Sequence, residues 1–416
     1  MSADYESQPR EPSHNGQSGR PGNEHPDHVK YTAPDRLPRI SDTTLRDSAH
    51  MPGVDFRPED GVVIARLLRA VGIDAIEVGI VSAADGGDLD LCRAVLDEVG
   101  ARHAMTLVLA RSRAQTRTDL RLSHELGFRA VMLSVPTSDE HATLKLGTAS
   151  RKRIMNLAAD AIRTAKDLGL HITFSAEDGA RTEIAFLREY AAYGLAAGAD
   201  RIRLAETVSI LTPDSTRRMV SQVVAAAPGL EVEIHSHNML GLAVANAIAA
   251  GEAGASWISA TVGGLGERGG NTPLAEVLAC MWRFWSDDRY QLGYLTELSQ
   301  QVAARSGTSF GATSGPTAEL SYSYEIAGQW QNPGAFEAVP AELVGNKRGI
   351  RVRSRLRPAL MRAFLPPGVA DDVDLDLFTQ DVRDRFLPAG RQCLNEAGLM
   401  SLISSYAAHH NVEQGA

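Results

Sequence analysis

The sequence has few cysteines, no long apolar run and no excess of basic residues. Its three cysteines, Cys92, Cys280 and Cys393, form no Cys-x-x-Cys pair, so neither a disulfide framework nor a thiolate zinc site is indicated. No apolar stretch approaches the roughly 20 residues of a membrane-spanning helix. With 42 Lys and Arg against 51 Asp and Glu, the formal net charge of -9 disfavours binding to nucleic acid or to anionic membranes. We therefore expect a cytoplasmic protein that binds neither.

The overall composition is that of an ordinary globular protein. The 416 residues are 44% hydrophobic and 22% charged, which suits one large domain and a smaller one. Residues 1–35 differ, because they are rich in Pro, Gly, Ser, Asn and charge and offer almost nothing apolar to a core. We expect this segment to be a disordered tail.

From Arg39 onward, short apolar runs alternate with longer stretches of helical spacing, with a repeat of about 30 residues. Eight runs read as strands: 39–43, 75–79, 103–110, 130–136, 171–177, 201–207, 231–238 and 257–264. Amphipathic helices are predicted between them at 58–71, 151–168, 184–197, 213–227 and 241–253. Eight such units predict an α/β fold, a (β/α)8 TIM barrel over residues 36–287. The alternative, a doubly wound open sheet, would need a phosphate-binding glycine turn after its first strand.

The alternation is lost after residue 287. Residues 288–416 are predicted to form an appended C-terminal helical region that serves as a lid or in dimerisation. Tyr322, Tyr324 and Trp330 form an aromatic cluster in it, for which packing and a lid function are both open.

A TIM barrel carries its chemistry at the carboxyl ends of its strands, and polar residues collect there in this sequence. They are residues 42–47, Glu77, Ser175, Glu177, Asp178, Glu206, Thr207, His235, His237 and the loop 263–271. Structural ion pairs are the alternative explanation for some of them. His235 and His237 lie two apart on one strand, so their rings share a face and reach one point beyond its end. That geometry suits a metal ion, although a strand histidine also serves as a hydrogen-bonded packing residue.

Several motifs in this order resemble the 2-isopropylmalate, homocitrate and citramalate synthases of the DRE-TIM metallolyase superfamily. They are Ser-Asp-Thr-Thr-Leu-Arg-Asp at 41–47, Ser-Ala-Glu-Asp at 175–178, Ala-Glu-Thr-Val at 205–208, His-Ser-His-Asn at 235–238 and Gly-Glu-Arg-Gly-Gly-Asn at 266–271. The resemblance covers roughly residues 39–279. It implies a barrel that uses a divalent metal ion, Mg, Mn or Zn, to condense an acyl-CoA with a 2-oxo acid.

The resemblance also implies roles for individual residues. The metal ligands would be Asp47, His235 and His237, with Asn271 close to the metal. Arg46 would lie beside the ketone oxygen of the substrate, where a fixed positive charge stabilises a developing alkoxide. Glu177 would orient water or substrate. The expected substrate-binding residues are Arg46, Glu77, Ser175, Thr207 and Asn271.

Departures from the family pattern concern the general base and the pocket loops. Ser48-Ala49-His50 replaces Gly-Glu-Gln, and residues 322–325, Tyr-Ser-Tyr-Glu, fall where the family has Ser-Gly-Ile-His. The histidine thought to assist deprotonation of the acyl-CoA is therefore missing. We rank Glu325 with a neighbouring tyrosine such as Tyr324 first as its replacement, and His50 second.

We expect an acyltransferase that joins acetyl-CoA to a 2-oxo acid and hydrolyses the thioester to a 2-hydroxy-2-carboxymethyl acid. The altered loops suggest an unusual 2-oxo acid, as in the phosphonomethylmalate, phosphinomethylmalate and benzylmalate synthases of specialised metabolism, including antibiotic biosynthesis. A homodimer is expected from the same resemblance. A lyase or aldolase of the same superfamily is the alternative enzyme, and a non-catalytic binding protein the alternative class.

Overall fold

The computed structural model describes residues 33–413 except 353–355, 366–372 and 386–393. Most of the expected disordered tail, residues 1–32, lies outside the described residues. Among the described residues, no helix combines the length and the apolar character needed to cross a membrane.

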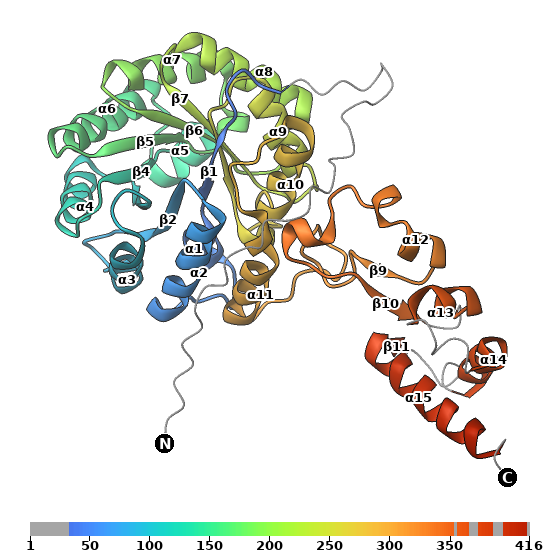
Figure 1. Cartoon of the computed structure of the whole chain (residues 1–416). Helices are drawn as coiled ribbons and strands as arrows, with labels where there is room; N and C mark the ends of the chain where they lie inside the picture. Colours follow the sequence, from blue (N-terminus) through green and yellow to red (C-terminus); the bar gives the residue numbers. More distant parts are fainter. Residues whose placement is uncertain (1–32, 353–355, 366–372, 386–393, 414–416) are drawn as a thin grey trace, which may run out of the picture. The chain divides into compact units, whose positions relative to one another are not determined.

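Eight parallel strands close into a barrel, as the sequence predicts (Figure 1). Each strand pairs with the next along the chain, and the eighth pairs with the first, with Ser41 opposite Ser259. The strands are β1 Arg39–Asp42, β2 Ala75–Ile80, β3 Ala104–Leu109, β4 Ala130–Ser134, β5 His171–Ala176, β6 Arg201–Glu206, β7 Glu231–Ser236 and β8 Trp257–Ala260.

Helices follow the strands and surround the barrel (Figure 1). The longer ones are α2 Pro58–Val71, α3 Leu89–Val99, α4 Arg113–Glu125, α6 Arg151–Asp167, α7 Ile184–Ala196, α8 Pro213–Ala226, α9 Ala243–Glu252 and α10 Leu274–Trp285. Local sequence explains their ends. α2 and α8 begin with Pro58 and Pro213, whose fixed φ suits the first helical position. Gly72 ends α2 at a φ of 95°, in the left-handed region that glycine adopts without strain.

Shorter helices shape the rim at the carboxyl ends of the strands. They are α1 Thr44–Asp47, the 3-10 helices η1 Ser48–His50, η2 Gly179–Arg181 and η3 Val262–Gly264, and α5 Asp139–Leu146. Only Thr43 separates β1 from α1, and η1 follows α1 directly, so residues 44–50 continue the chain from the carboxyl end of that strand. Much of the rim therefore consists of short helices, which have too few residues to show a helical period in the sequence.

The main core lies between the barrel and its helices. One face of each strand is apolar and fully buried, as at Ile40, Val108, Ile172 and Ile258. Phe174 of β5 shows how closely the layers pack, because its ring lies against Gly194 of α7, where a Cβ would come within 2.1 Å of the ring.

The other face of each strand points into the barrel, and it includes a small apolar cluster and a set of buried charged residues. Met105, Leu107 and Met132 form a small apolar cluster on β3 and β4. The barrel interior also holds a ladder of buried charges, in which Glu77 and Glu233 each bridge two guanidinium groups and Asp47 pairs with one. Its members are Asp47, Arg46, Glu77, Arg203, Glu233 and Arg201. The sequence analysis did not identify this ladder.

After α10 the chain forms a set of smaller elements. They are η4 Leu292–Tyr294, α11 Leu295–Ser306, β9 Ser323–Tyr324, α12 Ala327–Gln331, η5 Pro333–Ala335, η6 Ala341–Val344, β10 Gly349–Val352, α13 Pro358–Phe364, α14 Leu375–Arg385, β11 Leu394–Asn395 and α15 Glu396–Glu413. The three strands form a small sheet in the order β11-β10-β9 beside an apolar cluster of their own. The sequence analysis expected helices here and missed this sheet, because two-residue strands are too short to show an alternating pattern.

Candidate metal and substrate site

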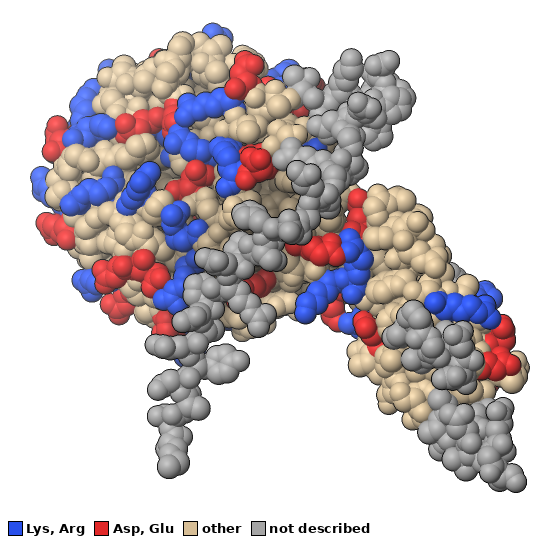
Figure 2. Space-filling model, in the orientation of Figure 1, with Lys and Arg blue, Asp and Glu red and all other residues tan. Residues whose placement is uncertain are grey.

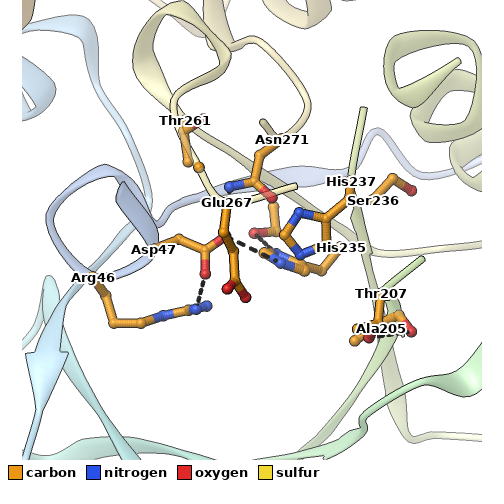
Figure 3. Close-up of polar contacts among 12 residues, drawn as sticks. Arg46, Asp47, Ala205, Thr207, His235, Ser236, His237, Thr261, Glu267 and Asn271 are labelled. Atoms are coloured by element: carbon orange, nitrogen blue, oxygen red, sulfur yellow. Dashed lines mark hydrogen bonds and ion pairs between the residues drawn. The ribbon is translucent and has the colours of Figure 1, made fainter. Parts of the chain in front are cut away.

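Three metal-ligating side chains meet at the carboxyl ends of the barrel strands. Asp47 ends α1 directly after β1, His235 lies in β7, and His237 follows β7. One ligand atom from each lies within 4.8 Å of the others, and all three side chains are buried. Figure 3 shows the two rings and the Asp47 carboxylate converging, with Arg46 beside Asp47. The barrel thus brings together residues that are almost 190 positions apart in the sequence.

Hydrogen bonds fix the orientation of both imidazole rings. Nδ1 of His235 lies 2.8 Å from Oγ of Ser259 on the neighbouring strand β8, and Nδ1 of His237 donates to the carbonyl oxygen of Gly270 at 3.2 Å. Their Nε2 atoms therefore serve the centre, and that of His235 lies 3.5 Å from Oδ2 of Asp47. Such partners on the second nitrogen are typical of metal-binding histidines.

The charge states suit a cation. Burial alone would raise the pKa of Asp47, but the Arg46 guanidinium and the hydrogen bond from Asn271 hold it well below its usual range. Burial lowers the pKa of His235 and of His237, so both rings stay neutral near pH 7. An ionised carboxylate and neutral imidazoles are the ligand forms that a divalent metal requires.

Asn271 completes the site. Its Nδ2 donates to Asp47 and, at 3.0 Å, to the carbonyl oxygen of Leu265. Its Oδ1 is buried and has no hydrogen-bond partner among the described residues. One carboxylate, two imidazoles and a free amide oxygen form a mixed N and O ligand set that suits Mg, Mn or Zn. These residues therefore fit the divalent metal ion that the resemblance implies.

The loop 263–271 supplies Asn271 and a further side chain that the sequence analysis missed. Its backbone has positive φ at five glycines and at Arg268. Gly270 needs both this conformation and the lack of a side chain, because a Cβ there would meet the Gly264 carbonyl oxygen at 2.1 Å. The Arg268 side chain lies 2.9 Å from Nε2 of His237 and donates to the Thr207 carbonyl oxygen at 2.9 Å.

Arg46 is held in place from both sides. It is 9% exposed, and its guanidinium pairs with Asp47 and with Oε1 of Glu77. The other Glu77 oxygen lies 2.7 Å from the Arg203 guanidinium, so this fully buried carboxylate bridges two cations. Its observed contacts position Arg46, and a contact of Glu77 with a substrate stays a prediction.

Ser175 and Thr207 present hydroxyl groups on neighbouring strands. Ser175 Oγ accepts a hydrogen bond from the Val135 amide at 3.1 Å, and Thr207 Oγ1 accepts one from the Asp178 amide at 3.0 Å. A hydroxyl that accepts keeps its own hydrogen to donate, which leaves the hydrogen of Ser175 available. The Thr207 hydroxyl also donates to the Ala205 carbonyl oxygen at 3.5 Å, so a bond from Thr207 to a substrate oxygen would replace this long contact.

Glu177 has partners that the sequence analysis did not find. His141 Nδ1 and Lys145 Nζ lie 2.8 Å and 2.5 Å from its Oε1, and Ser134 Oγ donates to Oε2 at 3.1 Å. Burial would raise the pKa of Glu177, but these hydrogen bonds and the Lys145 charge lower it. The signal in the sequence was the i, i+4 spacing of His141 and Lys145, which places both on one face of α5.

The candidate bases differ in their surroundings. His50 is exposed at the end of η1, and the described contacts of this residue do not include the metal ligands. Tyr324 is buried and donates to Glu337 at 2.6 Å, while Glu325 beside it is half-buried. Burial and the Glu337 charge raise the pKa of Tyr324, which argues against this phenol as an unaided base. The ranking of Glu325 and His50 stays a prediction.

Comparison with known proteins decides the family. Residues 37–302 match the family model described as HMGL-like. The chain belongs to the HMGL-like family. A 2-phosphonomethylmalate synthase of Streptomyces rubellomurinus is 36% identical over 74% of this chain and 82% of that protein. A 2-isopropylmalate synthase of Caldanaerobacter subterraneus is 36% identical over 75% and 80%, and a homocitrate synthase of Methanopyrus kandleri 35% identical over 75% and 78%. These relatives confirm the resemblance and favour a condensing synthase over the lyase alternative.

Solved structures confirm the fold of this HMGL-like chain. A hydroxymethylglutaryl-CoA lyase from Pseudomonas aeruginosa matches with a TM-score of 0.58 and 18% identity, over 67% of this chain and 96% of that one. The HMG-CoA lyase of Bacillus subtilis matches with a TM-score of 0.59 and 16% identity, over 68% and 97%. At this identity the likeness concerns the barrel and carries no argument about the reaction.

Proposed function

We propose that this protein is a metal-dependent acyltransferase that condenses acetyl-CoA with a 2-oxo acid and then hydrolyses the thioester. The observation that carries the proposal is the buried set of Asp47, His235, His237 and the unpartnered amide oxygen of Asn271, with Arg46 beside it. Family membership supports the same reaction. In Figure 2, Lys and Arg alternate with Asp and Glu across the visible barrel surface, which agrees with a small-molecule substrate rather than a nucleic acid.

Two groups of residues would activate the ketone of the substrate. Asp47, His235, His237 and Asn271 would hold Mg, Mn or Zn, and such an ion supplies Lewis-acid polarisation of the ketone when bound. Arg46, fixed by Glu77, adds a positive charge where the oxygen gains negative charge as the new carbon–carbon bond forms.

Binding of the 2-oxo acid and hydrolysis fall to other rim residues. The Ser175 and Thr207 hydroxyls would donate to the substrate carboxylate. Glu177, ionised and held by His141 and Lys145, would orient the water that attacks the thioester and releases coenzyme A as a thiol. The methyl proton of acetyl-CoA would leave to Glu325 with Tyr324, or to His50.

Substrate identity and assembly form the finer part of the proposal. The altered pocket loops and the 2-phosphonomethylmalate synthase relative support an unusual 2-oxo acid of specialised metabolism, including antibiotic biosynthesis. We also propose a cytoplasmic homodimer, with a catalytic barrel at 36–287 and a lid or dimerisation region at 288–416. A lid would exclude water during the condensation.

The test is thiol release from acetyl-CoA by the purified full chain, with a panel of 2-oxo acids and with Mg, Mn or Zn added singly. We expect release that requires both the 2-oxo acid and the metal, and a product whose mass corresponds to the added acetate unit. His237→Ala and Asp47→Ala should abolish release while the circular dichroism spectrum shows that the barrel stays folded, and His124→Ala on α4 is the matched control.

Two outcomes would refute the proposal. Full activity in metal-stripped protein would show that the metal assignment is wrong. Cleavage of a 3-hydroxyacyl-CoA, with no thiol release for any 2-oxo acid, would establish the lyase alternative instead.

A further inference from the structure

A cavity lies at the end of the barrel opposite the candidate metal ligands. It has a volume of about 520 Å³, which is within the range of small-molecule sites. The first residue of seven of the eight barrel strands lines it, so it is the amino-terminal mouth of the barrel. The proposed condensation makes no use of this end.

The wall of this cavity is strongly cationic. Its charged lining comprises five guanidinium groups, from Arg39, Arg69, Arg102, Arg129 and Arg201, and one carboxylate, from Asp74. That carboxylate already accepts hydrogen bonds from the Ile40 amide at 3.0 Å and from the Tyr290 hydroxyl at 2.8 Å. Asp74 is thus occupied by neutral donors.

Three of the five arginines have no carboxylate partner among the described residues. Arg69 donates to the Ile73 carbonyl oxygen at 3.0 Å and Arg129 to the Phe128 carbonyl oxygen at 2.9 Å. Arg102 is exposed and forms no ion pair with a carboxylate of the described residues. Each guanidinium carries five N–H donors, so one bond to a carbonyl leaves most of them available.

The other two arginines are built into the wall. Arg39 and Arg201 both stack on Trp257, with their guanidinium carbons 4.2 Å and 3.5 Å from the ring centroid. Arg201 is only 4% exposed, and it is held further by an ion pair of 3.0 Å with Glu233. Arg39 also pairs with Glu231, and Nε of Arg201 lies 3.7 Å from the same carboxylate, so both guanidinium groups are fixed parts of the wall. The charge available to an anion therefore comes from Arg69, Arg102 and Arg129.

Two histidines in the same wall have a lowered pKa, which agrees with its positive charge. Burial lowers the pKa of His103, and the charges of Arg69 and Arg102 lower it further. Burial and Arg201 do the same to His171. These shifts favour the neutral form of both rings. A neutral ring needs no carboxylate partner, so neither histidine places a negative group in the cavity that would repel an anion.

We propose that the amino-terminal mouth of the barrel binds a small oxyanion with two or more negative charges, of the phosphate or polycarboxylate type. Arg201 and Arg39, fixed on Trp257, form the floor of the site, and Arg69, Arg102 and Arg129 supply the unpaired charge around it. Guanidinium groups bind both oxyanion types through charge-assisted pairs of hydrogen bonds. The site is independent of the proposed condensation, because it lies at the other end of the barrel.

The test is isothermal titration calorimetry of the full-length, metal-stripped protein at low ionic strength, with inorganic pyrophosphate in one arm and citrate in the other. We expect one binding site for at least one of the two anions. Binding of pyrophosphate alone would assign the phosphate type, and binding of citrate alone the polycarboxylate type.

The decisive variant is Arg102→Ala with Arg129→Ala, since both side chains are exposed and neither has a carboxylate partner among the described residues. We expect affinity to fall about tenfold for each guanidinium removed. Arg188→Ala, an exposed arginine on α7 outside the cavity, should bind as the wild type does. No binding of either anion, or unchanged affinity in the double variant, would overturn the proposal. The second result would place the anion elsewhere, including at the metal site.

Discussion

Removal of Arg203 should destabilise the barrel strongly. This side chain is 1% exposed, and its guanidinium lies 2.7 Å from Glu77 and 2.9 Å from Glu233. Arg203→Met leaves two buried carboxylates facing each other without the cation between them. Breaking a buried ion pair by removing one partner costs about 3–5 kcal/mol, because the remaining charge is uncompensated. At an unfolding entropy of about 2 cal/mol/K per residue over the barrel, that loss lowers the Tm by about 6–10 °C.

The charge origin of this loss can be separated from a packing loss. Arg203→Met with Glu77→Gln removes one charge of each sign, and it leaves Arg46 paired with Asp47 and Arg201 paired with Glu233. We expect this double variant to be more stable than Arg203→Met alone. Arg117→Met breaks a surface pair with Asp160 whose arginine is 47% exposed, so its loss should stay below about 1 kcal/mol.

The loss should also depend on pH. In the wild type, burial raises the pKa of Glu77 but Arg203 and Arg46 lower it overall, so its ionised form stabilises the fold above the unfolded pKa of about 4.3. Without Arg203, burial raises the folded pKa, and stability then falls as pH rises from the unfolded value toward the new one. Urea unfolding at pH 5 and pH 8 should therefore show a larger difference from the wild type at pH 8. A loss below 1 kcal/mol at pH 8, or a double variant less stable than the single one, would refute this reasoning.

Two further variants test the packing and the metal site. Gly194→Ala should lower the Tm, because its Cβ would come within 2.1 Å of the buried Phe174 ring. Such overpacking costs about 1–3 kcal/mol, which exceeds the gain of about 0.5–1 kcal/mol in helix propensity. Gly293→Ala, with no atom near its Cβ, is the control, and equal Tm values of the two variants would contradict the packing described. Ser259→Ala should weaken metal binding about 10–100-fold in a competition assay with a fluorescent chelator, because Ser259 orients His235. The control is Ser41→Ala, on the paired strand, whose hydroxyl has no partner among the described residues and whose removal should leave the metal affinity unchanged. Equal metal affinities of the two variants would exclude the orienting role.

The barrel and the shared face of His235 and His237 can be predicted from the sequence because both depend on strong local patterns, whereas Asp47 was named as a candidate ligand through the family resemblance. Buried strands read as apolar runs, and the His-x-His spacing at 235 and 237 places both rings on one face whatever the rest of the chain does. Once eight strands are identified, the closure of the barrel brings Asp47 to the same rim.

The charge ladder could not be predicted because the same sequence pattern fits two structures: a strand with one face in water, and a strand whose polar face lies inside the barrel. Arg201 and Arg203 alternate with apolar residues, as do Glu231 and Glu233, and such alternation is typical of a strand with one face in water. Here the polar face points into the barrel, and only the three-dimensional pairing shows that the charges neutralise one another. His141 escaped notice for a similar reason, since its contact with Glu177 joins a helix to a strand 36 residues later.

Arg268 gives the metal site a feature that concerns the entry of the ion. Its guanidinium lies at Nε2 of His237, and this nitrogen has a single lone pair. The same lone pair cannot accept a hydrogen bond and bind a metal ion at once. A metal ion bound at this nitrogen would therefore have to displace the guanidinium. The Arg268 side chain is 37% exposed, so water can receive it when it leaves.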